Sequence, residues 1–165
     1  MSISTSAPTS AGSAAVVPGV TADVWDDAPV TAHNAIELIR APLLTDSAPY
    51  AYAAVASDIH RLVFTAGACP LDEHGATVAV GDVAGQAEQA MGNLRVALAA
   101  AGAGLTDVVK TTVYVASHNR DDLVIAWDVV RRHFGTRDVP STLLGVSVLG
   151  YPDQLVEIEA VAALR

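Results

Sequence analysis

Apolar and polar side chains alternate with helical spacing in two parts of the chain. Across residues 82–101, apolar residues recur every three or four positions and form one stripe, which predicts a helix. Asp82 is suited to cap the start of this helix, and Gly102 is suited to end it. The same spacing predicts a second helix over residues 121–134, ended by Gly135.

Six segments have the composition or the alternation typical of β-strands. They are residues 35–39, 50–56, 62–66, 107–116, 141–149 and 155–163. The second and third are expected to form a hairpin around residues 57–60. The order β, β, β, α, β, α, β, β predicts an α+β fold, with a mixed six-stranded sheet and both helices packed on one face.

Alternation in the two long strands predicts which side chains face away from the helices. In residues 107–116, four side chains are expected on one face: Val109, Thr111, Val113 and Val115. The other face of that strand would carry Lys110, Thr112 and Tyr114. In the last strand, the side chains expected to face the helices are Val156, Ile158 and Ala160. The residues expected on the uncovered face are Tyr114, Glu157, Glu159 and Val161, and a bare face of this kind favours self-association.

Residues 1–34 differ from the rest because they are rich in Ser, Ala, Thr, Pro and Gly and follow no sustained period. We interpret them as an N-terminal extension of a domain that spans residues 35–165. The extension is either a flexible tail or an arm that docks Trp25 and Val30 on a neighbouring subunit.

Composition excludes several classes of function. With 9 Lys and Arg against 18 Asp and Glu, the chain has a formal net charge of -9, which disfavours binding to nucleic acid or to an anionic membrane surface. No segment reads as membrane-spanning, and the first residues lack the basic region of a secretory signal. Cys69 is the single cysteine, so no intrachain disulfide can form, and the composition fits a cytoplasmic protein.

The last strand carries the clearest candidate for chemistry. Glu157 and Glu159 lie two residues apart and therefore share a face. Two carboxylates side by side would repel, which suits one of them to act as an acid or base, although both could simply be solvated. Cys69 reads as a structural thiol rather than a nucleophile, and none of the five histidines has metal-ligand spacing, so no metal site is predicted.

Several segments together resemble the RidA family, also called YjgF or L-PSP endoribonuclease-like. They run in family order: Leu62–Gly67, Gly81–Ala84 with Gln86, Asn93–Arg95, Ala99–Gly102, Asp107–Val115, His133–Gly135 and Leu155–Ala160. The resemblance implies a chorismate-mutase-like fold and a homotrimer with clefts between subunits. It also implies enamine or imine deamination by water attack, with no metal or organic cofactor.

The resemblance carries over to individual positions. It implies that Glu157 orients water or relays protons, and that Tyr50 or Tyr52 lines the cleft with Trp127. Ala66 stands where the family has a serine, and Trp127 stands where it has an asparagine. The family cysteine of the penultimate strand matches Thr142 or Leu143.

The family arginine that clamps the substrate carboxylate has no match, because Pro140 or Ser141 takes its place. Arg137 is a possible substitute. Backbone groups near Ser141 and Thr142 would hold the carbonyl or imine end of the substrate.

Two functional hypotheses follow. The chain is a divergent imine or enamine hydrolase whose substrate differs from small 2-imino acids, or it is a trimeric protein that binds a small ligand without turnover. In both cases the expected partners are other copies of the chain and a small molecule.

Overall fold

The computed structural model describes residues 35–165, so the predictions for residues 1–34 lie outside the described residues. The strands are β1 (Ile36–Ile39), β2 (Ala53–Ala56), β3 (Arg61–Phe64), β4 (Val108–Val115), β5 (Ser141–Gly145) and β6 (Val156–Leu164). The helices are α1 (Val83–Ala100) and α2 (Arg120–Phe134), with a 3-10 turn, η2 (Leu105–Asp107), between α1 and β4. The predicted order of elements is confirmed.

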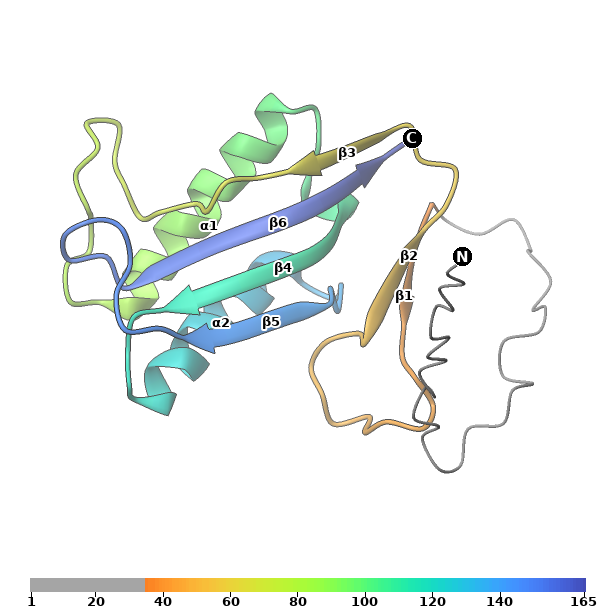
Figure 1. Cartoon of the computed structure of the whole chain (residues 1–165), viewed down its shortest axis with the longest axis horizontal. Coiled ribbons are helices and arrows are strands. Elements are labelled where there is room, and N and C mark those ends of the chain that lie inside the picture. The colour runs from red at the N-terminus through yellow and green to blue at the C-terminus, as the bar shows by residue number, and fades with distance from the viewer. Residues whose placement is uncertain (1–34) are drawn as a thin grey trace, which may run out of the picture. The chain divides into compact units, whose positions relative to one another are not determined.

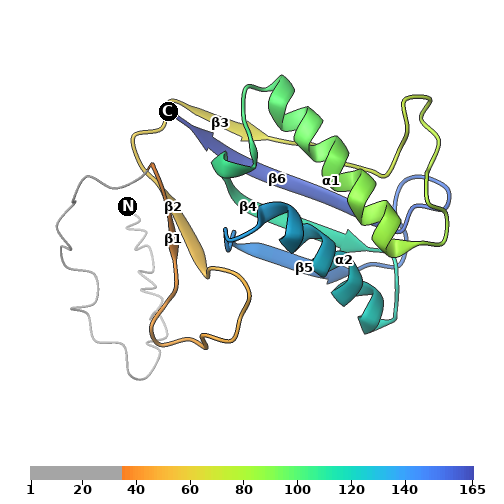
Figure 2. The same cartoon turned by 180° about the vertical axis from the view of Figure 1, so that it is seen from behind.

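The main sheet has the strand order β3-β6-β4-β5, and both helices pack on one of its faces (Figure 1, Figure 2). β4 and β5 are parallel and are joined through α2, whereas the other neighbours are antiparallel. α1 packs over β6, and α2 packs over β4 and β5. The opposite face, here called the open face, has no helix over it among the described residues.

The strands do not form one six-stranded sheet, and this part of the prediction was wrong. β1 and β2 form a separate antiparallel pair, in which Ile36 lies opposite Ala56 and Ile39 opposite Ala53. The predicted hairpin of β2 and β3 is therefore also wrong. β2 already pairs along its whole length with β1, and β3 instead pairs with the end of β6.

The boundary between the two sheets has a local cause. The Ser57 amide donates to the Ala35 carbonyl and closes the β1–β2 ribbon, and Asp58 then adopts a left-handed conformation at φ 53°. The His60 amide next donates to the Leu164 carbonyl, which begins the pairing with β6. The short loop thus transfers the chain from one sheet to the other.

The predicted helix ends are confirmed. The Asp82 side chain accepts a hydrogen bond from the Gly85 amide at 3.1 Å and caps α1. After the last turn of α1, Gly102 has φ +75°, a conformation that glycine adopts without a Cβ penalty. Gly135 ends α2 in the same way, at φ +61°.

The core lies between the helices and the covered face of the sheet. Met91, Leu94 and Leu98 of α1 are fully buried there, as are Val113 of β4 and Ile158 of β6. The alternation predicted for β6 is confirmed, because Val156, Ile158 and Ala160 are buried while the residues between them are half-buried. None of the helices among residues 35–165 is long and apolar enough to cross a membrane.

One position in β4 was assigned to the wrong face. The register with β6 shifts between Val108 and Lys110, so Val108 is buried and Val109 does not continue the row of Thr111, Val113 and Val115. An extra residue in one strand of a pair interrupts the alternation locally, and strict period two cannot foresee it. Lys110, Thr112 and Tyr114 nevertheless have the alternation that places them on the open face.

A buried glutamine joins α1 to the loop before β6. Gln86 has no exposed surface, its Nε2 donates to the Asp153 carbonyl at 2.8 Å, and its Oε1 accepts from the Leu155 amide at 2.7 Å. Both backbone groups would lose their partner if this side chain became apolar. Gln86 therefore fixes where β6 begins.

Gln86→Leu is expected to lower the free energy of unfolding by about 3 kcal/mol, because two backbone groups lose their hydrogen bonds at a buried site. Urea unfolding of the variant measures this. Val96→Ala on the exposed side of α1 is the control and should change stability by less than about 0.5 kcal/mol. If the two variants were equally stable, the hydrogen bonds of Gln86 would not contribute to holding the start of β6.

Candidate functional site

An aromatic pocket lies beside the edge strand β5. It has a volume of about 480 Å³. Its lining residues are Pro49, Tyr50, Trp127, Ser141, Thr142 and Leu143. The pocket therefore brings together four of the residues singled out in the sequence: Tyr50, Trp127, Ser141 and Thr142.

The aromatic wall of the pocket comes from two distant segments. The ring of Tyr50 meets Trp127 of α2 edge to face, with centroids 6.3 Å apart, a favourable geometry for two aromatic rings. Tyr52 does not line the pocket. Its ring meets that of Tyr50 edge to face, with centroids 5.9 Å apart, and its hydroxyl donates to the Thr45 carbonyl at 2.6 Å.

Arg40 holds the loop that carries Tyr50. Its guanidinium donates to the carbonyls of Ala48 and Tyr50 at 2.6 and 3.0 Å and to the Asp138 carboxylate at 2.6 Å. The Asp138 carbonyl in turn accepts from the Ala51 amide at 2.7 Å. The loop is thus tied to the segment that leads into β5, and this tie sets the width of the pocket.

The polar side of the pocket is the start of β5. Ser141 pairs with Thr111, and their hydroxyls are 2.6 Å apart towards the covered face of the sheet. Thr142 pairs with Thr112 and therefore points to the open face. The Thr142 hydroxyl accepts a hydrogen bond from the Lys110 ammonium at 2.5 Å.

Glu157 lies on the open face of β6, away from the aromatic pocket. It is opposite Tyr114 of β4, which in turn is opposite Leu144 of β5. Strand spacings place the α-carbon of Glu157 roughly 12 Å from that of Thr142. Within one chain, the structure therefore does not bring Glu157 to Tyr50 and Trp127.

The Glu157 side chain is held on the β3 side of β6. Its Oε2 accepts hydrogen bonds from Gln154 Nε2 at 3.0 Å and from Cys69 Sγ at 3.6 Å. Gln154 is only 4% exposed, so its amide group is fixed. Burial, with the Glu157 carboxylate nearby, raises the pKa of the Cys69 thiol, which disfavours the thiolate that a nucleophile would need.

The two glutamates of β6 are directed apart. While Glu157 bonds to Gln154, Glu159 Oε1 accepts a hydrogen bond from the Tyr114 hydroxyl at 3.0 Å. The predicted shared face is confirmed, but separate partners hold the two carboxylates. The Glu159 carboxylate raises the pKa of Tyr114, because it accepts the phenolic hydrogen and repels a phenolate.

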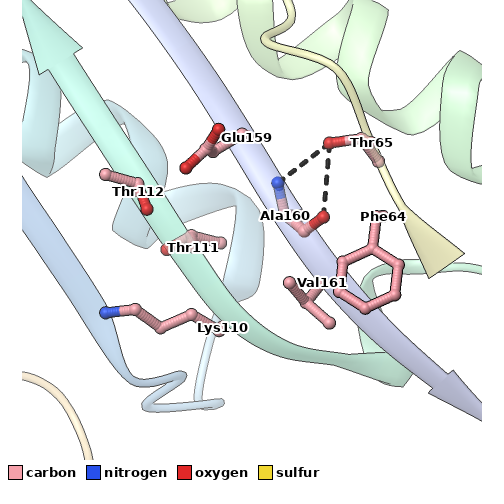
Figure 3. A pocket seen from close by; sticks show the side chains of 8 residues that line it. All are labelled: Phe64, Thr65, Lys110, Thr111, Thr112, Glu159, Ala160 and Val161. Carbon is pink, nitrogen blue, oxygen red and sulfur yellow. Dashed lines mark hydrogen bonds between the residues drawn. The ribbon is translucent and has the colours of Figure 1, made fainter. Parts of the chain in front are cut away.

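A second, smaller hollow of about 140 Å³ lies on the open face itself (Figure 3). The residues that line it are Phe64, Thr65, Lys110, Thr111, Thr112, Glu159, Ala160 and Val161. Phe64 is 71% exposed at this surface. The Lys110 chain runs across the face towards β5, where its ammonium reaches Thr142.

Two other predicted positions lie outside the pocket. Ala66 is exposed beyond the end of β3, at the opposite edge of the sheet from β5. Arg137 directs its guanidinium to the Val108 carbonyl at 3.3 Å rather than lining the pocket. Among the described residues, no group of three or more His, Cys, Asp or Glu side chains is arranged to hold a metal ion.

The sequence did not predict that Gln154, Arg40 and Lys110 contact the residues of the aromatic pocket or Glu157. Arg40 acts through contacts with distant segments, for which the sequence gives no local signal. Gln154 binds Glu157 only three residues further on, but this spacing alone does not predict the contact. For Lys110, however, the sequence does contain a signal. It is the only lysine of the chain, and the alternation of residues 107–116 places it on the open face.

Comparison with known proteins agrees with this architecture. The family model described as endoribonuclease L-PSP matches residues 43–164. A RutC family protein of Pyrococcus horikoshii is 35% identical over 114 residues, which cover 69% of this chain and 86% of the relative. The 2-iminobutanoate/2-iminopropanoate deaminase of Salmonella typhimurium is 34% identical over 128 residues, covering 74% of this chain and 97% of that enzyme.

Solved structures show the same fold. The crystal structure of YyfB of Yersinia pestis, a protein of unknown function of the conserved Rid family, matches with a TM-score of 0.72 at 28% identity. That match covers 79% of this chain and all of the other. With its two helices on a mixed sheet and its sequence match across most of the chain, the protein belongs to the RidA/YjgF family, whose model is described as endoribonuclease L-PSP.

Proposed function

We propose that this protein hydrolyses imines or enamines at a site formed between two copies of the chain. The observation that carries the proposal is the fixed Glu157 carboxylate on the uncovered face of the sheet, in a chain related to 2-iminobutanoate/2-iminopropanoate deaminases. The aromatic pocket supplies a place for the substrate, and Glu157 of the neighbouring copy supplies the base.

The separation of the two parts within one chain supports an intersubunit site. The pocket lies at the β5 edge of the sheet, whereas Glu157 leans towards β3 at the other edge. Leu62 and Phe64 of β3 and Leu144 of β5 expose 50%, 71% and 42% of their surface, so the open face and its edges have apolar area to bury. In a cyclic assembly, the edge of one copy meets the opposite edge of the next, and we propose a homotrimer closed in this way.

The proposed reaction needs one base that also returns a proton. Glu157 takes a proton from water as the oxygen attacks the imine carbon, and the resulting carbinolamine holds both oxygen and nitrogen on that carbon. Starting from the protonated imine, the same carboxylate then passes this proton to the amine nitrogen. As the carbon–nitrogen bond breaks, the carbinolamine hydroxyl gives its proton back to the carboxylate, and ammonia and a carbonyl product leave. Glu157 Oε2 is occupied by Gln154, while Oε1 accepts no hydrogen bond from a described residue, so Oε1 is the oxygen that meets water.

The walls of the pocket suggest the size of the substrate. Trp127 and Tyr50 present aromatic rings, and the pocket is large enough for a branched or aromatic side chain. We therefore propose a substrate bulkier and more apolar than 2-iminopropanoate. RNA is a poor substrate for a chain with net charge -9.

A non-catalytic binding protein is the second candidate. The residues that line the aromatic pocket include no arginine or other charged side chain, so a small ligand could be held there by stacking alone. This candidate predicts binding without turnover.

The position of Glu157 depends on glycine at residue 67. A Cβ at Gly67 would lie 1.8 Å from Glu157 Oε1 and 2.5 Å from its Cδ, so Gly67→Ala would force the carboxylate to move. We expect at least a ~10-fold loss of imine hydrolysis, because a displaced base loses its alignment. The loss is measured as kcat/KM.

Gly92→Ala is the matched control for the glycine variant. A Cβ at Gly92 meets nothing within 4 Å, so alanine there should stabilise α1 by about 0.5–1 kcal/mol and leave activity unchanged. Full activity of Gly67→Ala would argue against a catalytic Glu157 in this position.

The main test compares Glu157→Gln with Glu159→Gln in an imine hydrolysis assay. An amino-acid oxidase generates imines from small, branched and aromatic amino acids, semicarbazide competes for the imine, and formation of the keto acid is followed. We expect Glu157→Gln to lose about 10²- to 10⁴-fold in rate because the base is removed. Glu159→Gln, on the same face, should stay within a few-fold of the unmodified protein.

Two results would contradict the proposed activity. If the unmodified protein accelerates hydrolysis of no imine, the binding hypothesis is favoured. If both glutamine variants lose activity equally, the loss comes from the face of the sheet as a whole and Glu157 has no special role.

A further inference from the structure

Lys110 is a half-buried cation that pairs with no carboxylate in the described part of the chain. It is the only lysine in a chain of net charge -9, yet it forms no salt bridge with any residue from 35 to 165. Its aliphatic stem helps to line the hollow on the β4 side, where Lys110 pairs with Val161 of β6, and the residue is half-buried. Partial burial of an unpaired ammonium costs free energy, and an anion at the site would offset that cost.

The ammonium ends at the rim of the aromatic pocket. Lys110 Nζ donates to Thr142 Oγ1 at 2.5 Å, and Thr142 lines the pocket together with Tyr50 and Trp127. An ammonium has three donor hydrogens, so two remain for another acceptor. The exposed Thr142 hydroxyl also has a hydrogen of its own to donate.

From this juxtaposition we infer that Lys110 and Thr142 together bind the carboxylate of a 2-imino or 2-oxo acid whose apolar side chain packs against Tyr50 and Trp127. This inference rests on the proposed function for the identity of the imine. It assigns the negative end of the ligand to a lysine on β4 and a hydroxyl on β5. The apolar end is left to the two aromatic rings.

Alternative cations around the pocket are already engaged. The Arg40 guanidinium donates hydrogen bonds to the Asp138 carboxylate and to the carbonyls of Ala48 and Tyr50. Arg137 points to the Val108 carbonyl. Of these three cations, Lys110 is the one whose charged group donates to a side chain that lines the pocket, that of Thr142.

The test measures binding separately from turnover. The probes are 4-methyl-2-oxopentanoate and its uncharged amide, titrated by calorimetry into the full-length protein and into Lys110→Met and Lys110→Arg. Lys110→Met should weaken binding of the carboxylate by roughly 10- to 100-fold, as expected for one lost hydrogen bond to a charged group. Lys110→Arg should restore most of it, and binding of the amide should be equal in all three proteins.

If Lys110→Met folds poorly, the variant Thr142→Val provides a second test of carboxylate binding. Thr142→Val removes only the hydroxyl of an exposed residue and should weaken the carboxylate several-fold while leaving the amide unaffected. Equal loss for carboxylate and amide in these variants would overturn the inference. So would a failure of the unmodified protein to prefer the carboxylate to its amide.

Failure of this inference can be told apart from failure of the proposed function. Imine hydrolysis that depends on Glu157 but is unaffected by Lys110→Met leaves the function intact and overturns the role of Lys110. Lys110-dependent binding without turnover of any imine supports the inference and overturns the enzyme.

A titration adds a readout that a merely structural lysine would not give. Burial lowers the pKa of Lys110, since it disfavours the ammonium form, and the titratable neighbour in the hollow is Glu159 of β6. Reductive methylation with ¹³C labels the single lysine and the terminal amine, so the pKa of Lys110 can be followed by NMR. It should lie below that of a free lysine and rise when 4-methyl-2-oxopentanoate binds; no rise on binding would contradict a contact with the carboxylate.

Discussion

The alternation of side chains along β6 is the constraint on which the rest of the structure depends. Val156, Ile158 and Ala160 are buried beneath the helices, and this burial forces Glu157, Glu159 and Val161 onto the opposite face. A slip of one residue would bury both carboxylates and expose the core of the sheet. The same packing that stabilises the fold therefore places an acidic residue on a surface that no helix of residues 35–165 covers.

Polar contacts, most of them between distant segments, hold the side chains of the candidate site in place. Gln86 fixes the start of β6, and Gln154, at the same end, holds the Glu157 carboxylate. Arg40 and Asp138 tie the Tyr50 loop to the entrance of β5. These contacts hold the carboxylate and the aromatic pocket in place, but the pocket lies at the β5 edge of the sheet and Glu157 lies on β6, two strands away. The reaction centre that we propose therefore combines groups from two copies of the chain.

Much of this architecture could be predicted from the sequence, because both helices have clear apolar stripes and both long strands alternate. The helix caps at Asp82, Gly102 and Gly135 follow from local chemistry for the same reason. The separate β1–β2 pair could not be predicted, since short strands of three or four apolar residues fit several partners equally well. The bulge near Val109 was missed because Val108 and Val109 are both apolar, so the sequence does not show which of them faces the core.

The candidate site was only partly accessible from the sequence. Tyr50, Trp127, Ser141 and Thr142 do meet around one pocket, although Trp127 lies 77 positions after Tyr50 and no periodicity relates them. The resemblance to a family suggested these residues, whereas composition and spacing did not. Gln154, Arg40 and Lys110 act through contacts that only the folded chain creates.

The most direct test of the account is complementation between two inactive variants. Chains with Glu157→Gln keep the aromatic pocket, and chains with Tyr50→Ala keep the carboxylate, so each alone should have little imine hydrolysis. After unfolding and joint refolding of equal amounts, a site between neighbouring copies should recover about a quarter of the unmodified activity, because one in four pairings joins two intact halves. A mixture no more active than the average of the two separate variants would contradict an active site shared between copies.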